Sequence, residues 1–226
     1  MFGEFPADFR VSREKYRTRG LPKGANLIHL RGDDLAELKR DWVEKAHVPP
    51  PADLRAAAAA APSAVHIRAR LADPPDLDYL RDTIGVVQAL MDEGGVATLA
   101  IQSFGWWSAD AWRERVFEKG QQALVPELTV ILHAAEERGK GLWVHTRGMR
   151  QFARSDISVR NVPQANLQDA ARLCNALNKL QVGGGLILEG QEINAAGLPA
   201  GLTCHHAGTV DDPDFNNVHV EIGWPG

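Results

Sequence analysis

Two stretches of the chain repeat the same order of elements, and this repetition restricts the fold more than any other feature. In each stretch an alternating apolar and polar run predicts a strand, and an apolar stripe at spacings of three and four predicts a helix. Glycines then end the helix before a short apolar run. The two stretches are 65–101 and 157–188, and their helices align without gaps, so that Leu80 matches Leu167. Duplication of one strand–helix–strand unit explains this order.

Each unit must bury one face of its strand and of its helix, and two such units can share one sheet with helices on one side. Four further strands are predicted from apolar alternation, at 128–133, 142–146, 202–209 and 218–224. The last two are expected to form an antiparallel pair. We therefore predict an α+β (or α/β-like) fold in which the duplicated units share a mixed, mainly antiparallel sheet with helices packed on it.

The first 62 residues differ from the repeated part. Residues 1–24 show no period and indicate an irregular arm, whose basic residues, Lys15 and Arg19 among them, are either an anion contact or a solvated surface. Prolines at 49–51 end one predicted helix, and Pro62 ends an alanine-rich one. We predict an N-terminal part, 1–62, with an arm and helices packed on the body, and a duplicated α+β body, 63–226.

Composition excludes several classes of function. The net charge of −4 and the isoelectric point near 6.1 disfavour a nucleic-acid partner, because phosphate binding normally needs a basic domain. Cys174 and Cys204 are too few for a disulfide framework and indicate a reducing compartment. No apolar run approaches the roughly 20 residues of a membrane helix. We expect a cytoplasmic protein without membrane contact or cofactor, and leave a homo-oligomer open.

A basic cluster is the most distinctive candidate site. Four arginines (Arg147, Arg150, Arg154 and Arg160) accompany a single acid, Asp156, just after His145 at the end of a predicted strand. Guanidinium groups bind carboxylates and phosphates through paired hydrogen bonds, and histidine titrates near neutral pH. The cluster could therefore hold a small anionic ligand beside a titratable group. The alternative is that the arginines pair with scattered surface acids.

A second candidate is a metal site. Cys204 and His206 would share one face of a strand, and His219 lies on the predicted partner strand, so three ligands of the types that zinc prefers could meet. The alternative is an ordinary sheet face that carries histidines. Asp212, Asp214 and Asn216 copy the first half of a calcium loop, but the glutamate that should follow is missing. A turn-forming loop is the better interpretation there.

Residues 141–162, together with the helix start at Trp107-Ser108, resemble an uncharacterised bacterial family of domains of unknown function. In that family a strand leads into a Thr-Arg-Gly or Thr-His-Gly turn and then into Phe-Gly-Arg-Pro-Asp. The chain has Thr146-Arg147-Gly148 and then Phe152-Ala153-Arg154-Ser155-Asp156, without the second glycine and the proline. The resemblance covers a little more than the C-terminal half, and it implies a compact α+β domain with no established activity.

Two classes of function remain. The chain lacks the Gly-x-Ser-x-Gly, His-Glu-x-x-His and Cys-x-x-Cys motifs, and Trp106 and Trp107 are of a type enriched at interfaces, although tryptophan also packs in cores. This favours a binding or regulatory protein, of an immunity or stress-associated type, with a protein partner. The alternative is an enzyme for an anionic small molecule, in which His145 is the acid–base group, Arg147 and Arg150 hold the anion, and a metal assists. It predicts that these side chains converge.

Overall fold

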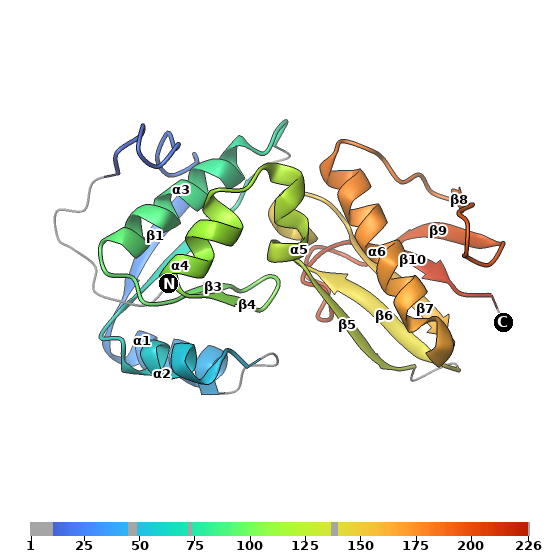
Figure 1. The fold of residues 1–226 in the computed structure, drawn as a ribbon, viewed down its shortest axis with the longest axis horizontal. Helices are drawn as coiled ribbons and strands as arrows, with labels where there is room; N and C mark the ends of the chain where they lie inside the picture. Colours follow the sequence, from blue (N-terminus) through green and yellow to red (C-terminus); the bar gives the residue numbers. More distant parts are fainter. Residues whose placement is uncertain (1–10, 45–48, 72–73, 137–139, 226) are drawn as a thin grey trace. The chain divides into compact units, whose positions relative to one another are not determined.

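The computed structural model describes residues 11–44, 49–71, 74–136 and 140–225. The chain divides into two compact units, Met1–Gly120 (unit 1) and Gln121–Gly226 (unit 2). The described residues form a mixed α+β protein with six α-helices, a six-stranded sheet and two small hairpins (Figure 1). The boundary expected at 62/63 falls inside unit 1. None of the helices in these ranges has the length and apolarity that a membrane crossing requires.

Unit 1 begins with two strands that flank two helices. Strand β1 (Ala25–Leu30) pairs with β2 (Ala64–Ala69) in antiparallel register, across the expected domain boundary. Helix α1 (Gly32–Lys39), which continues as a π-helical turn, and helix α2 (Ala52–Ala60) lie between these strands in the sequence. Their apolar sides form one core cluster, made of Leu35, Val43, Leu54, Ala58, Ala61, Ala64 and Ala97. A strand ladder therefore joins residues on the two sides of the expected boundary.

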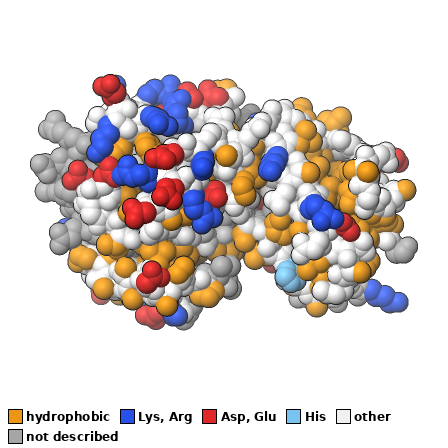
Figure 2. Space-filling view, in the orientation of Figure 1, with side chains coloured by type: hydrophobic (Ala, Val, Ile, Leu, Met, Phe, Trp, Pro, Cys, Tyr) orange, Lys and Arg blue, Asp and Glu red, His pale blue; other side chains and the backbone are white. Residues whose placement is uncertain are grey.

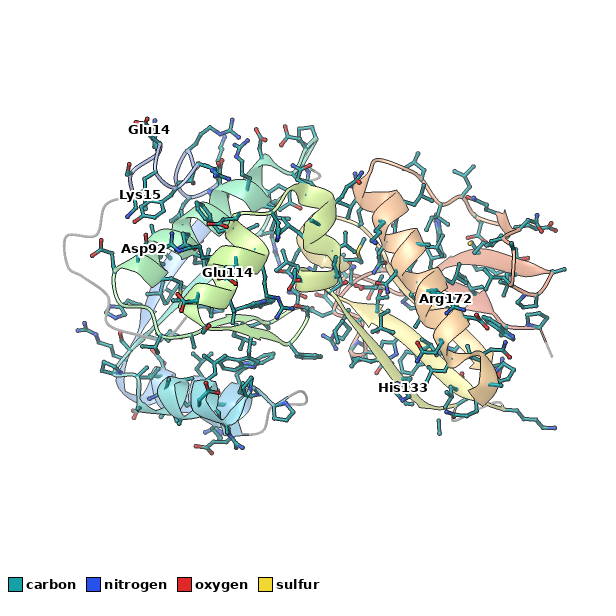
Figure 3. The ribbon with its side chains drawn as sticks, in the orientation of Figure 1. Glu14, Lys15, Asp92, Glu114, His133 and Arg172 are labelled. Carbon is teal, nitrogen blue, oxygen red and sulfur yellow. The ribbon has the colours of Figure 1, made fainter. Side chains whose placement is uncertain are left out.

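The described part of the arm packs on helix α3 (Asp78–Asp92). The hydroxyl of Thr18 donates to the carbonyl of Asp82 at 2.8 Å, and Arg19 pairs with the Asp82 carboxylate at 3.1 Å. Lys15 and Asp92, both labelled in Figure 3, form an ion pair of 3.1 Å. Charged side chains gather over α3 and α4 in Figure 2. Lys15 and Arg19 are thus held by acids of α3.

A hairpin and a short helix complete unit 1. Strands β3 (Thr98–Ala100) and β4 (Gly105–Trp107) pair antiparallel. Helix α4 (Ala109–Trp112) follows and extends into a π-helical turn. Ser108 caps this helix as its sequence predicts, because its hydroxyl accepts a hydrogen bond from the backbone N–H of Ala111 at 3.3 Å.

Unit 2 is built on one sheet. Helix α5 (Val125–Leu128) precedes β5 (Val130–Ala135), β6 (Leu142–Arg147) and β7 (Asp156–Val162). Helix α6 (Leu167–Val182) leads to β8 (Glu192–Ile193), β9 (Leu202–Ala207) and β10 (His219–Gly223). The strand order is β5-β6-β7-β10-β9-β8, and only the β7–β10 pair is parallel. The predicted mixed, mainly antiparallel sheet is confirmed, as is the β9–β10 pair.

Helix α6 covers one face of this sheet (Figure 1). The core between them consists of buried apolar side chains from both elements, which include Val144, Ile157, Val159, Cys174, Leu177, Val220 and Ile222. Because side chains alternate along a strand, the neighbours of these residues point to the opposite face. That opposite face carries polar and aromatic side chains, and the candidate site lies there.

The prediction that the duplicated units share a sheet is wrong. Strand β2 lies in the two-stranded sheet of unit 1, and β7 lies in the six-stranded sheet of unit 2. The strand predicted at 186–188 does not form either. Main-chain groups there bond to side chains instead, since the N–H of Leu188 donates to Gln191 at 2.9 Å and the carbonyl of Ile187 lies 2.9 Å from a ring nitrogen of His206. Helices α3 and α6 and strand β3 are confirmed.

Candidate functional site

The polar face of the unit 2 sheet carries a row of aromatic rings and a cation. On β6, Trp143 and His145 lie on the side away from Val144 and the core. Their rings stack with centroids 4.0 Å apart. The guanidinium of Arg160, on β7, lies 4.1 Å from the centre of the Trp143 ring and is also 3.2 Å from the Glu221 carboxylate on β10. Cation–π contact and ion pairing together fix these side chains on the sheet.

The loop Gly208–Val218, between β9 and β10, covers part of this face with one aromatic ring. Phe215 is 2% exposed and stacks on His219 with centroids 4.1 Å apart. Its ring also meets His145 edge-on at 5.4 Å. The loop has a local cause, because the Asp212 carboxylate accepts from the backbone N–H groups of Asp214 and Phe215 at 3.0 and 3.2 Å. This bonding fits the turn-forming interpretation of the Asp/Asn-rich segment.

Three side chains clamp this loop onto the sheet, and we call Gly208–Val218 the clamped loop. Arg147 donates to the carbonyl of Asp214 at 2.7 Å. Arg150 donates to the carbonyls of Val210 and Asn216 at 2.8 and 2.6 Å. The amide of Asn217 donates to the Arg154 carbonyl and to the Asp156 carboxylate, both at 2.8 Å. The arginines predicted to hold an anion therefore bind carbonyl oxygens of the chain itself.

Asp156 is the buried centre of this arrangement. Its carboxylate is fully buried and accepts from the hydroxyl of Thr146 at 2.9 Å and from the N–H of Met149 at 3.3 Å, as well as from Asn217. Burial raises the pKa of Asp156 to about 6, although these donors and the charge of Arg147 oppose the shift. The carboxylate joins β6, β7 and the clamped loop.

The His145 side chain is buried and packs against the rings of Trp143 and Phe215. It is 7% exposed, and burial lowers its pKa to about 4, with smaller contributions from the charges of Arg147, Arg160 and His219. Burial also lowers the pKa of His219. Both imidazoles are thus neutral at pH 7, and His145 is a weak base because its conjugate acid loses its proton so readily.

The three candidate metal ligands do not come together. Cys204 and His206 share the face of β9 that turns toward α6, as expected, but His219 lies opposite Ala207 in the register and so shares the other face. His206 is directly opposite Val220. A difference of one residue in register reverses the face of a side chain. Among the residues that the structure describes, no group of three His, Cys, Asp or Glu side chains could hold a metal ion.

The remaining candidates have structural roles. Arg154 donates to the carbonyl of Gln181, in the last turn of α6, at 3.1 Å. Trp107 is 3% exposed and packs edge-on against Trp112, whereas its neighbour Trp106 is half-buried against the core of unit 1. The paired tryptophans therefore follow the packing alternative more than the interface one.

Sequence reasoning missed three residues of the site, Trp143, Phe215 and Asn217. The strand alternation of 142–147 could have placed Trp143 beside His145. Phe215 is the single aromatic residue in the polar run 208–217, and an apolar ring in such a run is a signal for a loop anchor. Nothing in the sequence indicates that Asn217 would reach Asp156.

Ala153 gives a first prediction. It ends the turn Met149–Phe152 in the left-handed conformation, with φ 52° and ψ 42°. A side chain is unfavourable in that conformation, so Ala153→Gly is expected to raise the free energy of unfolding by roughly 0.5–1 kcal/mol. Urea denaturation measures it. The same change at Ala176, exposed on α6, should lower stability by about 1 kcal/mol; a loss at both positions would contradict the argument.

No protein-family model matches this chain, and no curated protein or solved structure matches it either.

Proposed function

We propose that the chain is a binding protein of a regulatory kind, which presents the clamped loop to a protein partner as a preformed surface. The observation that supports this most is the bonding of Arg147 and Arg150. Both donate to main-chain carbonyls of the loop, whereas the enzyme alternative needs them for an anionic substrate. The low pKa of His145 also argues against a role as general base near neutral pH.

A clamped loop suits recognition for an energetic reason. Each residue that is already ordered before binding saves the conformational entropy that ordering would otherwise cost. The loop exposes apolar Val210 and Val218 together with the carboxylates of Asp211 and Asp214. The partner of this chemistry is a protein surface that combines basic and apolar side chains. A regulator of the immunity or stress-associated type would use this loop to occupy a surface of its target.

The clamp itself can be tested in the isolated chain. We expect Arg150→Ala to remove the hydrogen bonds to Val210 and Asn216 and to make loop opening about 1 kcal/mol easier, since these bonds are exposed. The backbone N–H of Phe215 should then exchange about fivefold faster with solvent. Hydrogen exchange followed by mass spectrometry measures this. Arg172→Ala, on the exposed face of α6, is the matched control and should leave the loop unchanged.

The binding role is tested by affinity capture with the full chain as bait. We expect a specific protein to be retained by the wild-type chain and by Arg172→Ala, and to be lost with the double variant Asp211→Lys/Asp214→Lys, which reverses the exposed loop charges. Arg150→Ala should retain less of it than the control. Equal retention by the wild type and the charge-reversed variant would show that the clamped loop is not the recognition surface.

A further inference from the structure

We propose that β5 pairs with β5 of a second copy of this chain, antiparallel and with residue 133 on the twofold axis. This interface goes beyond the function proposed above, because it uses the edge of the sheet and not the clamped loop. Strand β5 is an edge strand, because it lies at one end of the sheet order. His133, which projects from it, is exposed and is labelled in Figure 3.

The hydrogen bonds of β5 show which of its groups are free. The N–H of Glu136 donates to the carbonyl of Gly141 at 3.1 Å, so in the antiparallel register Leu132 and Ala134 also face β6. The N–H and C=O groups of the alternate residues, Ile131, His133 and Ala135, therefore point away from β6. Within the described residues, no other segment donates to these groups or accepts from them.

The two edges of the sheet differ in how well they are protected from pairing with another chain. Beyond β9 lies β8, which is only two residues long. The carboxylate of Glu189 accepts from the backbone N–H of His206 at 2.6 Å, and Gly190 and Gln191 bond to Cys204. A short strand and a charged cap are devices that keep an edge from pairing with another chain. Strand β5 has no such protection, since residues 130–135 contain neither a charged residue nor proline.

The side chains of β5 are complementary to those of a second copy. Around a twofold axis at His133, Ile131 lies opposite the Ala135 of the second copy, and Leu132 lies opposite its Ala134. Ile131 and Leu132 thus each meet an alanine, one on each face of the strand, while Val130 lies opposite Glu136 of the second copy. The outward N–H and C=O groups of all three free residues are satisfied in the same register. This symmetry favours a second copy over an unrelated strand.

Charge exchange at the axis tests the proposal, because like charges directly opposite on two strands repel and opposite charges attract. In sedimentation equilibrium of the full chain we expect the wild type to approach twice the 24.7 kDa of one chain as concentration rises. His133→Lys alone and His133→Glu alone should remain at the mass of one chain. An equal mixture of the two should recover the double mass.

Position 133 is exposed on an edge strand, so at concentrations where the wild type is also a single chain both variants should melt at its temperature, which circular dichroism checks. Ala176→Lys, on the exposed face of α6, is the matched control and should dimerise like the wild type. A wild type that stays at single mass at every concentration overturns the proposal. So does a dimer that survives His133→Lys, or a Lys and Glu mixture that fails to restore the double mass, because neither is compatible with pairing through residue 133.

Discussion

Replacing Gly85 with alanine is expected to lower the free energy of unfolding by about 3 kcal/mol. Gly85 lies inside α3, where alanine normally stabilises a helix by about 1 kcal/mol. Here a Cβ atom would come within 2.2 Å of the Tyr16 carbonyl oxygen and 2.8 Å of the Thr18 Cβ atom. Both belong to the buried part of the arm, so the arm must shift and its bonds to Asp82 weaken. Urea denaturation of the full chain measures the loss.

A second glycine provides the control for this result. A Cβ atom on Gly120 would meet no atom within 4 Å, so Gly120→Ala should change stability by less than about 1 kcal/mol. The hydrogen exchange of residues 16–20 should increase in Gly85→Ala and not in Gly120→Ala. If Gly85→Ala were neutral or stabilising, the contact between the arm and α3 would contribute little to the stability of unit 1.

The helices of the fold could be predicted because the residues that determine each helix lie close together in the sequence. The apolar stripes that begin at Leu80 and at Leu167 define α3 and α6 within a few turns of chain. Strand pairing is not local, and the same alternating pattern suits any partner. For this reason the sequence predicts strands at β2 and β7 but places them in one sheet, although β1 is the actual partner of β2.

The candidate site also depends on contacts between residues that are far apart in the sequence, and these contacts could not be predicted. The sequence brings His145, Arg147 and Arg150 into one region, because they follow one another along β6 and its turn. Their partners come from the clamped loop, more than 50 residues further along the chain. A guanidinium satisfies its hydrogen bonds equally well with an external anion or with carbonyl oxygens of its own chain. Only the closure of the β9–β10 loop over the sheet distinguishes the two.

Two of the buried titratable groups of unit 2, Asp156 and His145, act on stability in opposite directions. The pKa of Asp156 is raised to about 6 from the 3.8 of an exposed carboxyl, so the folded state holds the proton more tightly and gains stability as the pH falls from about 6 to 3.8. The pKa of His145 is lowered from 6.5 to about 4, so the unfolded state holds that proton more tightly. The two contributions partly cancel between pH 4 and 6.

Removal of His145 should expose this cancellation. His145→Phe keeps an aromatic ring between Trp143 and Phe215 but does not titrate. As the pH falls from 6.5 to 4, the unfolded chain takes up a proton at His145 that the folded chain does not. This difference alone should lower the free energy of unfolding of the wild type by about 3 kcal/mol. The free energy of unfolding of the variant should therefore exceed that of the wild type by a margin that grows over this window.

Urea denaturation at a series of pH values measures the margin, and the difference between the two proteins cancels the other titrating groups, including Arg147, Arg160 and His219 around the ring. Asp156→Asn should change the difference with the opposite sign, because it removes a group that stabilises the folded state on acidification. A margin that stays constant from pH 7 to pH 4 would mean that His145 takes up its proton as readily in the folded protein as in the unfolded chain. The ring would then have to leave its place beneath Phe215, and the loop could not remain clamped over it at low pH.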